Sequence, residues 1–107
     1  MKLNVIERIE LLKLVIPPKE GDYLTFKILF DLRVALSFKE KEFKQFGIIE
    51  KEGQISWAES KDVEVKIGEK GKEIIAESLR KVDAAKKLNP VTFTLCDKFE
   101  VFTETNK

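Results

Sequence analysis

The chain has 107 residues, of which 43% are hydrophobic and 36% are charged. This composition is typical of one globular domain and excludes disorder over the whole chain. Twenty basic and nineteen acidic side chains leave a net charge of +1, so the overall charge does not steer the protein toward nucleic acid or anionic membranes.

The first 36 residues predict two helices. From Leu3 to Ile16, apolar residues recur every three or four positions, and Pro17-Pro18 ends the helix because proline lacks the amide hydrogen. Tyr23–Leu36 fits a helix whose buried arc includes Phe26, Phe30 and Val34. Its first part, Tyr23–Phe30, also fits an alternating strand. The length of the segment favours the helix, because strands usually end near six residues.

A third, short helix is predicted over Phe38–Phe46. Ser37 and Glu40 have the spacing of a capping box, in which each side chain accepts a hydrogen bond from the other residue's amide. Gly47 fits the left-handed conformation that ends many helices, and Ile48 can then fold back on Phe43.

Strands are predicted next. Ile48–Lys51 and Gln54–Trp57 flank Glu52-Gly53, which fits the tip of a β-hairpin. From Val63 to Ile67, apolar and charged residues alternate, as in a strand with one face in the core. Gly68 ends this strand.

The remaining sequence predicts a long helix and one ambiguous element. Glu69–Leu88 has a helical apolar stripe and two favourably spaced ion pairs, Glu77–Lys81 and Asp83–Lys87. Asn89-Pro90 ends this helix and fits the start of another. Over Val91–Phe102 the spacing of Phe93, Cys96 and Phe99 fits a helix, whereas Val91–Leu95 fits a strand.

These elements predict a single α+β domain over residues 1–102, helix-rich and with a small antiparallel sheet. We expect residues 103–107 to form a flexible tail. Three helices followed by a hairpin also give the order of a winged helix.

The sequence does not predict an enzyme, because it contains no histidine and so lacks the usual proton-transfer and metal-binding side chain. Gly68–Lys72 is too short for a phosphate-binding Walker loop, and the acidic residues near the hairpin lack the spacing of a calcium loop. Cys96 fits a buried core thiol, and as the single cysteine it excludes an internal disulfide and indicates a cytoplasmic protein. We therefore expect no cofactor, no metal and no catalytic residue.

Protein binding is the leading functional hypothesis. A mixed-charge surface suits protein partners, including a second copy, better than polyanions. Three aromatic residues are the candidate anchors: Trp57 in the hairpin region, and Phe99 and Phe102 near the C-terminus. For Trp57, a position in the core is the favoured alternative. The apolar stretches are interrupted by charges and too short to cross a bilayer, so no membrane partner is expected.

Binding of DNA is the alternative. In a winged helix, Phe38–Phe46 would be the recognition helix and residues 50–54 the tip of the wing. The candidate contacts are Lys39, Lys41, Lys44, Lys51 and Arg33. Glutamates alternate with these lysines, and base reading favours arginine or an amide side chain, which weighs against this alternative.

Three segments, Ile16–Asp22, Ser37–Phe43 and Lys66–Lys70, resemble small uncharacterised proteins encoded by bacterial phages and prophages. The resemblance covers most of the chain but rests on non-specific motifs. It implies a small accessory protein in a phage-like context, such as an assembly component or a binder of a host protein. It implies no catalytic or ligand-binding residue.

Overall fold

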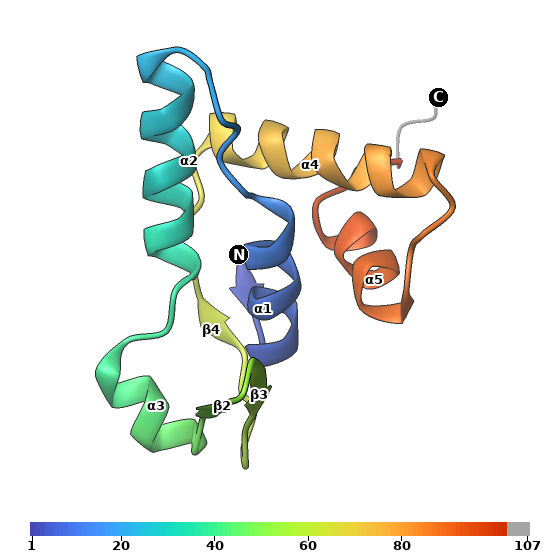
Figure 1. The fold of residues 1–107 in the computed structure, drawn as a ribbon. Coiled ribbons are helices and arrows are strands. Elements are labelled where there is room, and N and C mark those ends of the chain that lie inside the picture. Colours follow the sequence, from blue (N-terminus) through green and yellow to red (C-terminus); the bar gives the residue numbers. More distant parts are fainter. Residues whose placement is uncertain (103–107) are drawn as a thin grey trace.

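Four helices form the larger part of the structure, and a short helix with a β-hairpin lies at one end (Figure 1). The computed structural model describes residues 1–102, so the tail predicted at 103–107 lies outside the described residues. The helices are α1 (Val5–Leu14), α2 (Tyr23–Leu36), α3 (Glu40–Phe46), α4 (Glu69–Ala84) and α5 (Pro90–Lys98). The strands are β1 (Lys2–Leu3), β2 (Ile49–Lys51), β3 (Gln54–Ser56) and β4 (Val63–Glu64).

Within residues 1–102 there are two sheets, each of two antiparallel strands. β2 and β3 form the predicted hairpin, and Glu52 and Gly53 at its tip both have positive φ angles, 51° and 78°. This is the backbone geometry that joins two strands through a two-residue turn. β4 pairs with β1, so only the first part of the predicted strand Val63–Ile67 lies in a sheet. The protein is thus an α+β domain, as predicted.

The prediction of helix α2 is confirmed, and the strand alternative over Tyr23–Phe30 is wrong. Asp22 caps the N-terminal end of the helix, because its Oδ1 accepts a hydrogen bond from the amide of Thr25 at 2.7 Å. The first helix is shorter than the predicted Leu3–Ile16. It begins after Asn4, whose side chain accepts from the amide of Glu7, while Lys2 and Leu3 lie in β1.

The capping box predicted between Ser37 and Glu40 is wrong. The Ser37 hydroxyl donates to the carbonyl oxygen of Arg33 at 2.6 Å, so it belongs to the end of α2. The amide of Lys39 instead donates to Glu42 Oε1 at 2.8 Å. Helix α3 begins at the next residue, Glu40, rather than at the predicted Phe38. The predicted left-handed Gly47 is confirmed, with φ of 63°.

Helix α4 ends at Ala84, four residues before the predicted Leu88. Lys86 has a φ of 59°, and its amide donates to the carbonyl oxygen of Asp83. Lys87 therefore lies beyond the helix, and the helical pair predicted between Asp83 and Lys87 is wrong. The predicted Glu77–Lys81 pair is confirmed at 3.9 Å.

The ambiguous C-terminal element is a helix, so the strand alternative over Val91–Leu95 is wrong. Asn89 caps α5 by accepting from the amide of Thr92 at 2.9 Å. Pro90 occupies the first helical position, where its missing amide hydrogen has no intrahelical partner to lose.

Two hydrophobic cores hold these elements. The main core lies among α1, α2, α4 and α5, and its completely buried members include Leu11, Leu36, Ile75, Leu79 and Leu95. The second core lies between the N-terminal end of α1, α3 and the residues on either side of the hairpin. Its buried members are Val5, Ile9, Phe46 and Ile48. Because α1 contributes to both cores, it joins the helical body to the end that carries α3 and the hairpin. Among the described helices, none has the length and apolarity needed to cross a membrane.

Candidate protein-docking surface

Helix α2 exposes a row of large apolar side chains. Tyr23, Leu24, Phe30 and Val34 are 81%, 64%, 66% and 59% exposed. Such exposure is unusual for contiguous apolar residues, which mark interaction sites when they form a patch. We call these four residues, together with Lys27 and Asp31 between them, the outer face of α2.

Helix periodicity explains why this face is free. Leu29, Leu32 and Leu36 recur at three and four residues and are buried in the main core. Tyr23, Lys27, Phe30 and Val34 follow spacings of four, three and four residues, which place them along the opposite side of the same helix. The prediction that Phe30 and Val34 widen the buried arc is therefore wrong, whereas Phe26 is half-buried.

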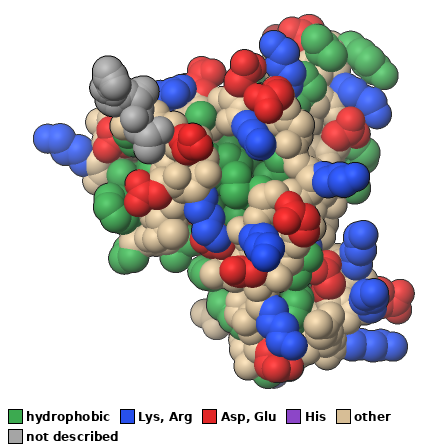
Figure 2. Space-filling model, turned by 180° about the vertical axis from the view of Figure 1, so that it is seen from behind, with side chains coloured by type: hydrophobic (Ala, Val, Ile, Leu, Met, Phe, Trp, Pro, Cys, Tyr) green, Lys and Arg blue, Asp and Glu red, His purple; other side chains and the backbone are tan. Residues whose placement is uncertain are grey.

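The apolar surface is visible in the space-filling view. Hydrophobic side chains protrude at the upper right of Figure 2, over the loop between α1 and α2 and the N-terminal end of α2. Ile16 in this loop is also exposed. Ile16 lies at the other end of this loop, next to Val15, whose carbonyl oxygen accepts from Arg33.

Arg33 fixes α2 against α1. Its Nη1 donates to the carbonyl oxygens of Leu12 and Val15 at 2.7 and 2.9 Å, at the C-terminal end of α1. These are carbonyls without a partner inside α1. Arg33, the one arginine among the residues predicted to contact DNA, is therefore half-buried and hydrogen-bonded within the protein through its Nη1.

A groove of about 390 Å³ lies beside α2, between α1, α3 and the hairpin. Most of its surface is apolar, and Lys13, Arg33 and Glu50 are its charged residues. Arg33 and Ser37 in its wall are one helical turn from Phe30 and Val34, so the groove borders the outer face. Its apolar lining consists of Ile9, Leu12, Phe38, Phe43, Ile48 and Ile55.

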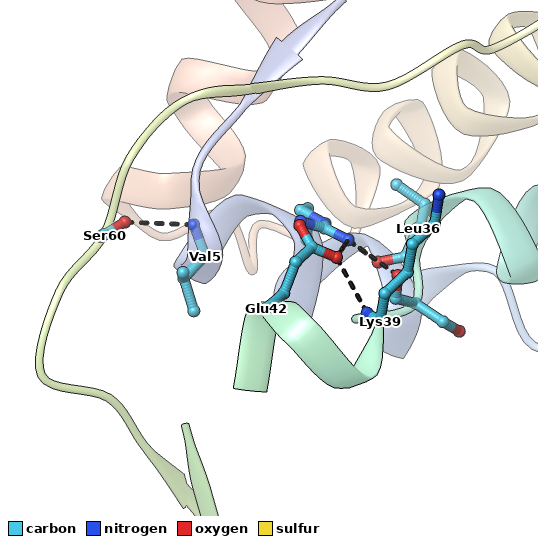
Figure 3. Close-up of polar contacts among 7 residues, drawn as sticks. Val5, Leu36, Lys39, Glu42 and Ser60 are labelled. Carbon is cyan, nitrogen blue, oxygen red and sulfur yellow. Dashed lines mark hydrogen bonds and ion pairs between the residues drawn. The ribbon is translucent and has the colours of Figure 1, made fainter. Parts of the chain in front are cut away.

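A buried ion pair holds α3 in place beside this groove (Figure 3). Arg8 on α1 and Glu42 on α3 meet through two hydrogen bonds, Nη1 to Oε2 at 2.7 Å and Nη2 to Oε1 at 3.1 Å. Arg8 also donates to the carbonyl oxygens of Leu36 and Ser37 at the end of α2, at 3.1 and 2.7 Å. Its guanidinium carbon lies 4.3 Å from the centre of the Phe38 ring. One side chain therefore connects α1, the end of α2 and α3.

The ion pair predicts a specific dependence of stability on pH. The hydrogen bonds from Arg8 hold the pKa of Glu42 below its usual value, against the opposing effect of burial. A carboxyl group whose pKa is lower in the folded state stabilises the fold above its unfolded pKa, about 4.3, and loses this contribution as the pH falls through the folded pKa.

We therefore expect the wild type to lose stability in this acidic range more steeply than Glu42→Gln. Urea unfolding at a series of pH values measures the difference. Two curves that stay parallel from pH 7 to pH 3 would contradict the role given to this carboxylate.

The structure does not bring the three predicted aromatic anchors together. Trp57 is half-buried and packs against the second core, whereas Phe99 is half-buried and packs against the main core. Phe102 is 51% exposed. Of the three residues, only Phe102 is placed as an anchor would be.

The four lysines predicted to contact DNA are all exposed. Lys39 and Lys41 border a shallow hollow that also includes Gln45 and Glu64. Lys51 ends β2 at the tip of the hairpin. In Figure 2, several basic side chains stand at the lower right, at the end of the molecule that carries α3, with acidic side chains among them. The surface there has mixed charge.

The buried polar groups have structural partners. Glu7 accepts from Lys98 Nζ at 2.8 Å and from the amide of Asn4 at 2.9 Å, and Arg8 and Glu42 bind each other. Burial raises the pKa of the Cys96 thiol, which disfavours the reactive thiolate. Within residues 1–102, no group of three or more potential ligands is arranged to hold a metal ion.

The sequence matches no protein-family model, and comparisons with curated proteins and with solved structures found no match.

Proposed function

We propose that this protein is a non-catalytic binding module that contacts another protein chain through the outer face of α2. The observation that carries the proposal is the exposure of Tyr23, Leu24, Phe30 and Val34 along one helix. Aromatic residues are enriched at protein interfaces, where they provide much of the binding energy. The groove beside α2 would extend the contact toward the hairpin.

The size of the surface suits this role. A fully exposed large side chain offers roughly 150–250 Å², so the apolar part of the outer face amounts to about 500 Å². A standard interface buries about 800 Å² on each partner, of which a little over half is apolar. The outer face therefore supplies enough apolar surface for the centre of such an interface.

The test is a paired substitution on the outer face, Phe30→Ser with Val34→Ser. Both side chains are exposed, so the free energy of unfolding of the isolated chain should change by less than about 1 kcal/mol. Binding to the partner chain, whether another protein of the source cell or a second copy, should weaken by at least about tenfold.

The matched control is Phe93→Ser on α5, which removes an equally exposed phenylalanine, 61% against 66% for Phe30. This variant should bind like the wild type. The proposal is wrong if the paired variant associates with itself and with proteins of a cell extract as the wild type does.

DNA binding is the second candidate, and the exposure of Lys39, Lys41, Lys44 and Lys51 is the observation that favours it. If these lysines bind phosphates, affinity for duplex DNA should fall steeply between 50 and 200 mM salt. Replacing Lys41 and Lys44 with glutamine should weaken binding for all sequences alike. The absence of binding at low salt would remove this candidate.

The resemblance to phage-encoded proteins implies an accessory role in assembly or in binding a host protein. A small module that acts through an exposed apolar helix fits either role. This origin remains a proposal.

A further inference from the structure

We propose that the partner of the outer face is a second copy of this chain, and that the two α2 helices pair in antiparallel orientation around a twofold axis. This inference rests on the proposed function, because it assigns an occupant to the same surface. Two features of α2 support it: the placement of its charges and the area of its exposed apolar residues.

The charges on the outer face are complementary to themselves in this arrangement. Lys27 and Asp31 are more than half exposed and are the charged residues between the apolar ones, with their Nζ and Oδ1 atoms 3.4 Å apart. An antiparallel twofold pair whose axis passes through the middle of the outer face brings Tyr23 opposite Val34 of the second copy. It also brings Lys27 beside Phe30 and Asp31 of the second copy.

Two intermolecular ion pairs then form, one on each side of the axis. The aliphatic part of each Lys27 side chain can lie on the Phe30 ring while its ammonium group reaches Asp31 of the second copy. The one cation and the one anion of the face, which pair within one helix, thus each gain a partner of opposite charge from the second copy.

The parallel orientation lacks this complementarity. It would place Lys27 opposite Lys27 and Asp31 opposite Asp31 of the second copy. Like charges facing each other across an interface are destabilising and select against an orientation. The sequence of the outer face therefore specifies the antiparallel pair.

The exposed area is sufficient for a dimer. Two outer faces contribute about 1,000 Å² of apolar surface, and stable interfaces bury about 1,200–2,000 Å² in total. The polar side chains around the apolar ones, among them Lys27 and Asp31, supply the rest. The dimer buries the largest apolar surface that α2 presents to solvent.

Sedimentation equilibrium of purified chains tests the inference. The wild type should form dimers that dissociate on dilution. In a dimer of Lys27→Asp, the two acidic side chains at positions 27 and 31 of one copy lie opposite the same two of the other copy. In a dimer of Asp31→Lys, the opposing side chains are all basic. Each substitution should therefore raise the dimer dissociation constant by at least about tenfold. An equimolar mixture of the two variants should form a heterodimer, and the double exchange Lys27→Asp with Asp31→Lys should restore the homodimer.

A matched control lies on α4, where Glu77 and Lys81 form an exposed pair of the same spacing at 3.9 Å. Glu77→Lys and Lys81→Asp should leave the dimer unchanged, and circular dichroism should show that all variants remain folded. The inference is overturned if the wild type is a monomer at several hundred micromolar. It is also overturned if the α2 and α4 variants weaken the dimer equally or the mixture fails to pair.

The outcomes also separate the inference from the proposed function. A monomeric wild type that binds another protein, with this binding lost in Phe30→Ser with Val34→Ser, overturns the second copy but supports the outer face as a docking surface. A wild type that is monomeric and whose contacts are all indifferent to that paired substitution overturns both.

Discussion

Replacing Arg8 with methionine is expected to lower the free energy of unfolding by about 3–5 kcal/mol, because the Glu42 carboxylate is left buried without its partner. Two further losses add to this effect. The carbonyl oxygens of Leu36 and Ser37 lose their donor, and Phe38 loses the guanidinium group above its ring. Methionine is a suitable replacement because it keeps the length of the side chain and adds no polar group.

Urea unfolding followed by circular dichroism measures this loss. Lys70→Met is the matched control, because Lys70 pairs with Glu73 at 3.6 Å with both side chains largely exposed. That change should cost less than about 1 kcal/mol. The double variant Arg8→Met with Glu42→Leu should be more stable than Arg8→Met alone, since it removes the unpaired carboxylate. A loss of less than about 1 kcal/mol for Arg8→Met would contradict the account of how α3 is held.

Truncation of Phe46 to alanine should cost about 3–5 kcal/mol. Phe46 is 1% exposed and is the largest side chain of the second core, so its removal leaves a cavity next to Val5, Ile9 and Ile48. Val5 and Ile9 lie on α1, and no other described helix of the main core contributes a buried residue to the second core. The damage should therefore begin at the end of the molecule that carries α3 and the hairpin.

Trp57 gives a direct measurement of this effect. It is the one tryptophan of the chain and packs against the second core, so its fluorescence reports the state of that core. For Phe46→Ala, the midpoint of the fluorescence change in urea should fall by about 2 M, given a slope of about 1–3 kcal/mol per molar urea. Phe93→Ala removes an exposed phenylalanine and should change the midpoint of the fluorescence transition little. Equal midpoints for Phe46→Ala and the wild type would show that the second core does not depend on this residue.

The elements predicted best from the sequence are those determined by neighbouring residues. Gly47, the Glu52-Gly53 turn and the Asn89-Pro90 helix start each follow from local backbone requirements, and the structure confirms all three. The pairing of β1 with β4 joins residues about sixty positions apart, and no local pattern indicates it. Ser37 shows the same limit, because its hydroxyl had two possible partners and the end of α2 prevailed over the start of α3.

The candidate site was harder to predict, because it depends on which apolar residues find a partner. Helix α2 is apolar on nearly every side, so its sequence does not distinguish the buried Leu29 and Leu32 from the exposed Phe30 and Val34. That difference arises when α1 and α4 cover one side only. One signal in the sequence could have indicated the site. The fourteen residues of α2 include more apolar residues than one buried helix face requires, so some of them had to be exposed.

Arg33 and Trp57 illustrate why residue type alone does not determine what a side chain contacts. An arginine near a predicted recognition helix favours a nucleic-acid contact, but two free carbonyl oxygens at the end of α1 engage this one. A tryptophan near a hairpin fits either a core position, which the sequence favours, or an exposed anchor, and Trp57 is half-buried against the second core. In both cases contacts with residues distant in the sequence determine where the side chain lies.

Hydroxyl-radical footprinting of the aromatic side chains is the most direct test of the claim that the outer face of α2 is a contact surface. The wild type would be labelled dilute, concentrated and in an extract of the source organism. Tyr23 and Phe30 should become less reactive in at least one of the last two samples. Phe93 on α5, whose exposure is close to that of Phe30, should react alike in all three. Unchanged reactivity of Tyr23 and Phe30 in every sample would contradict the claim.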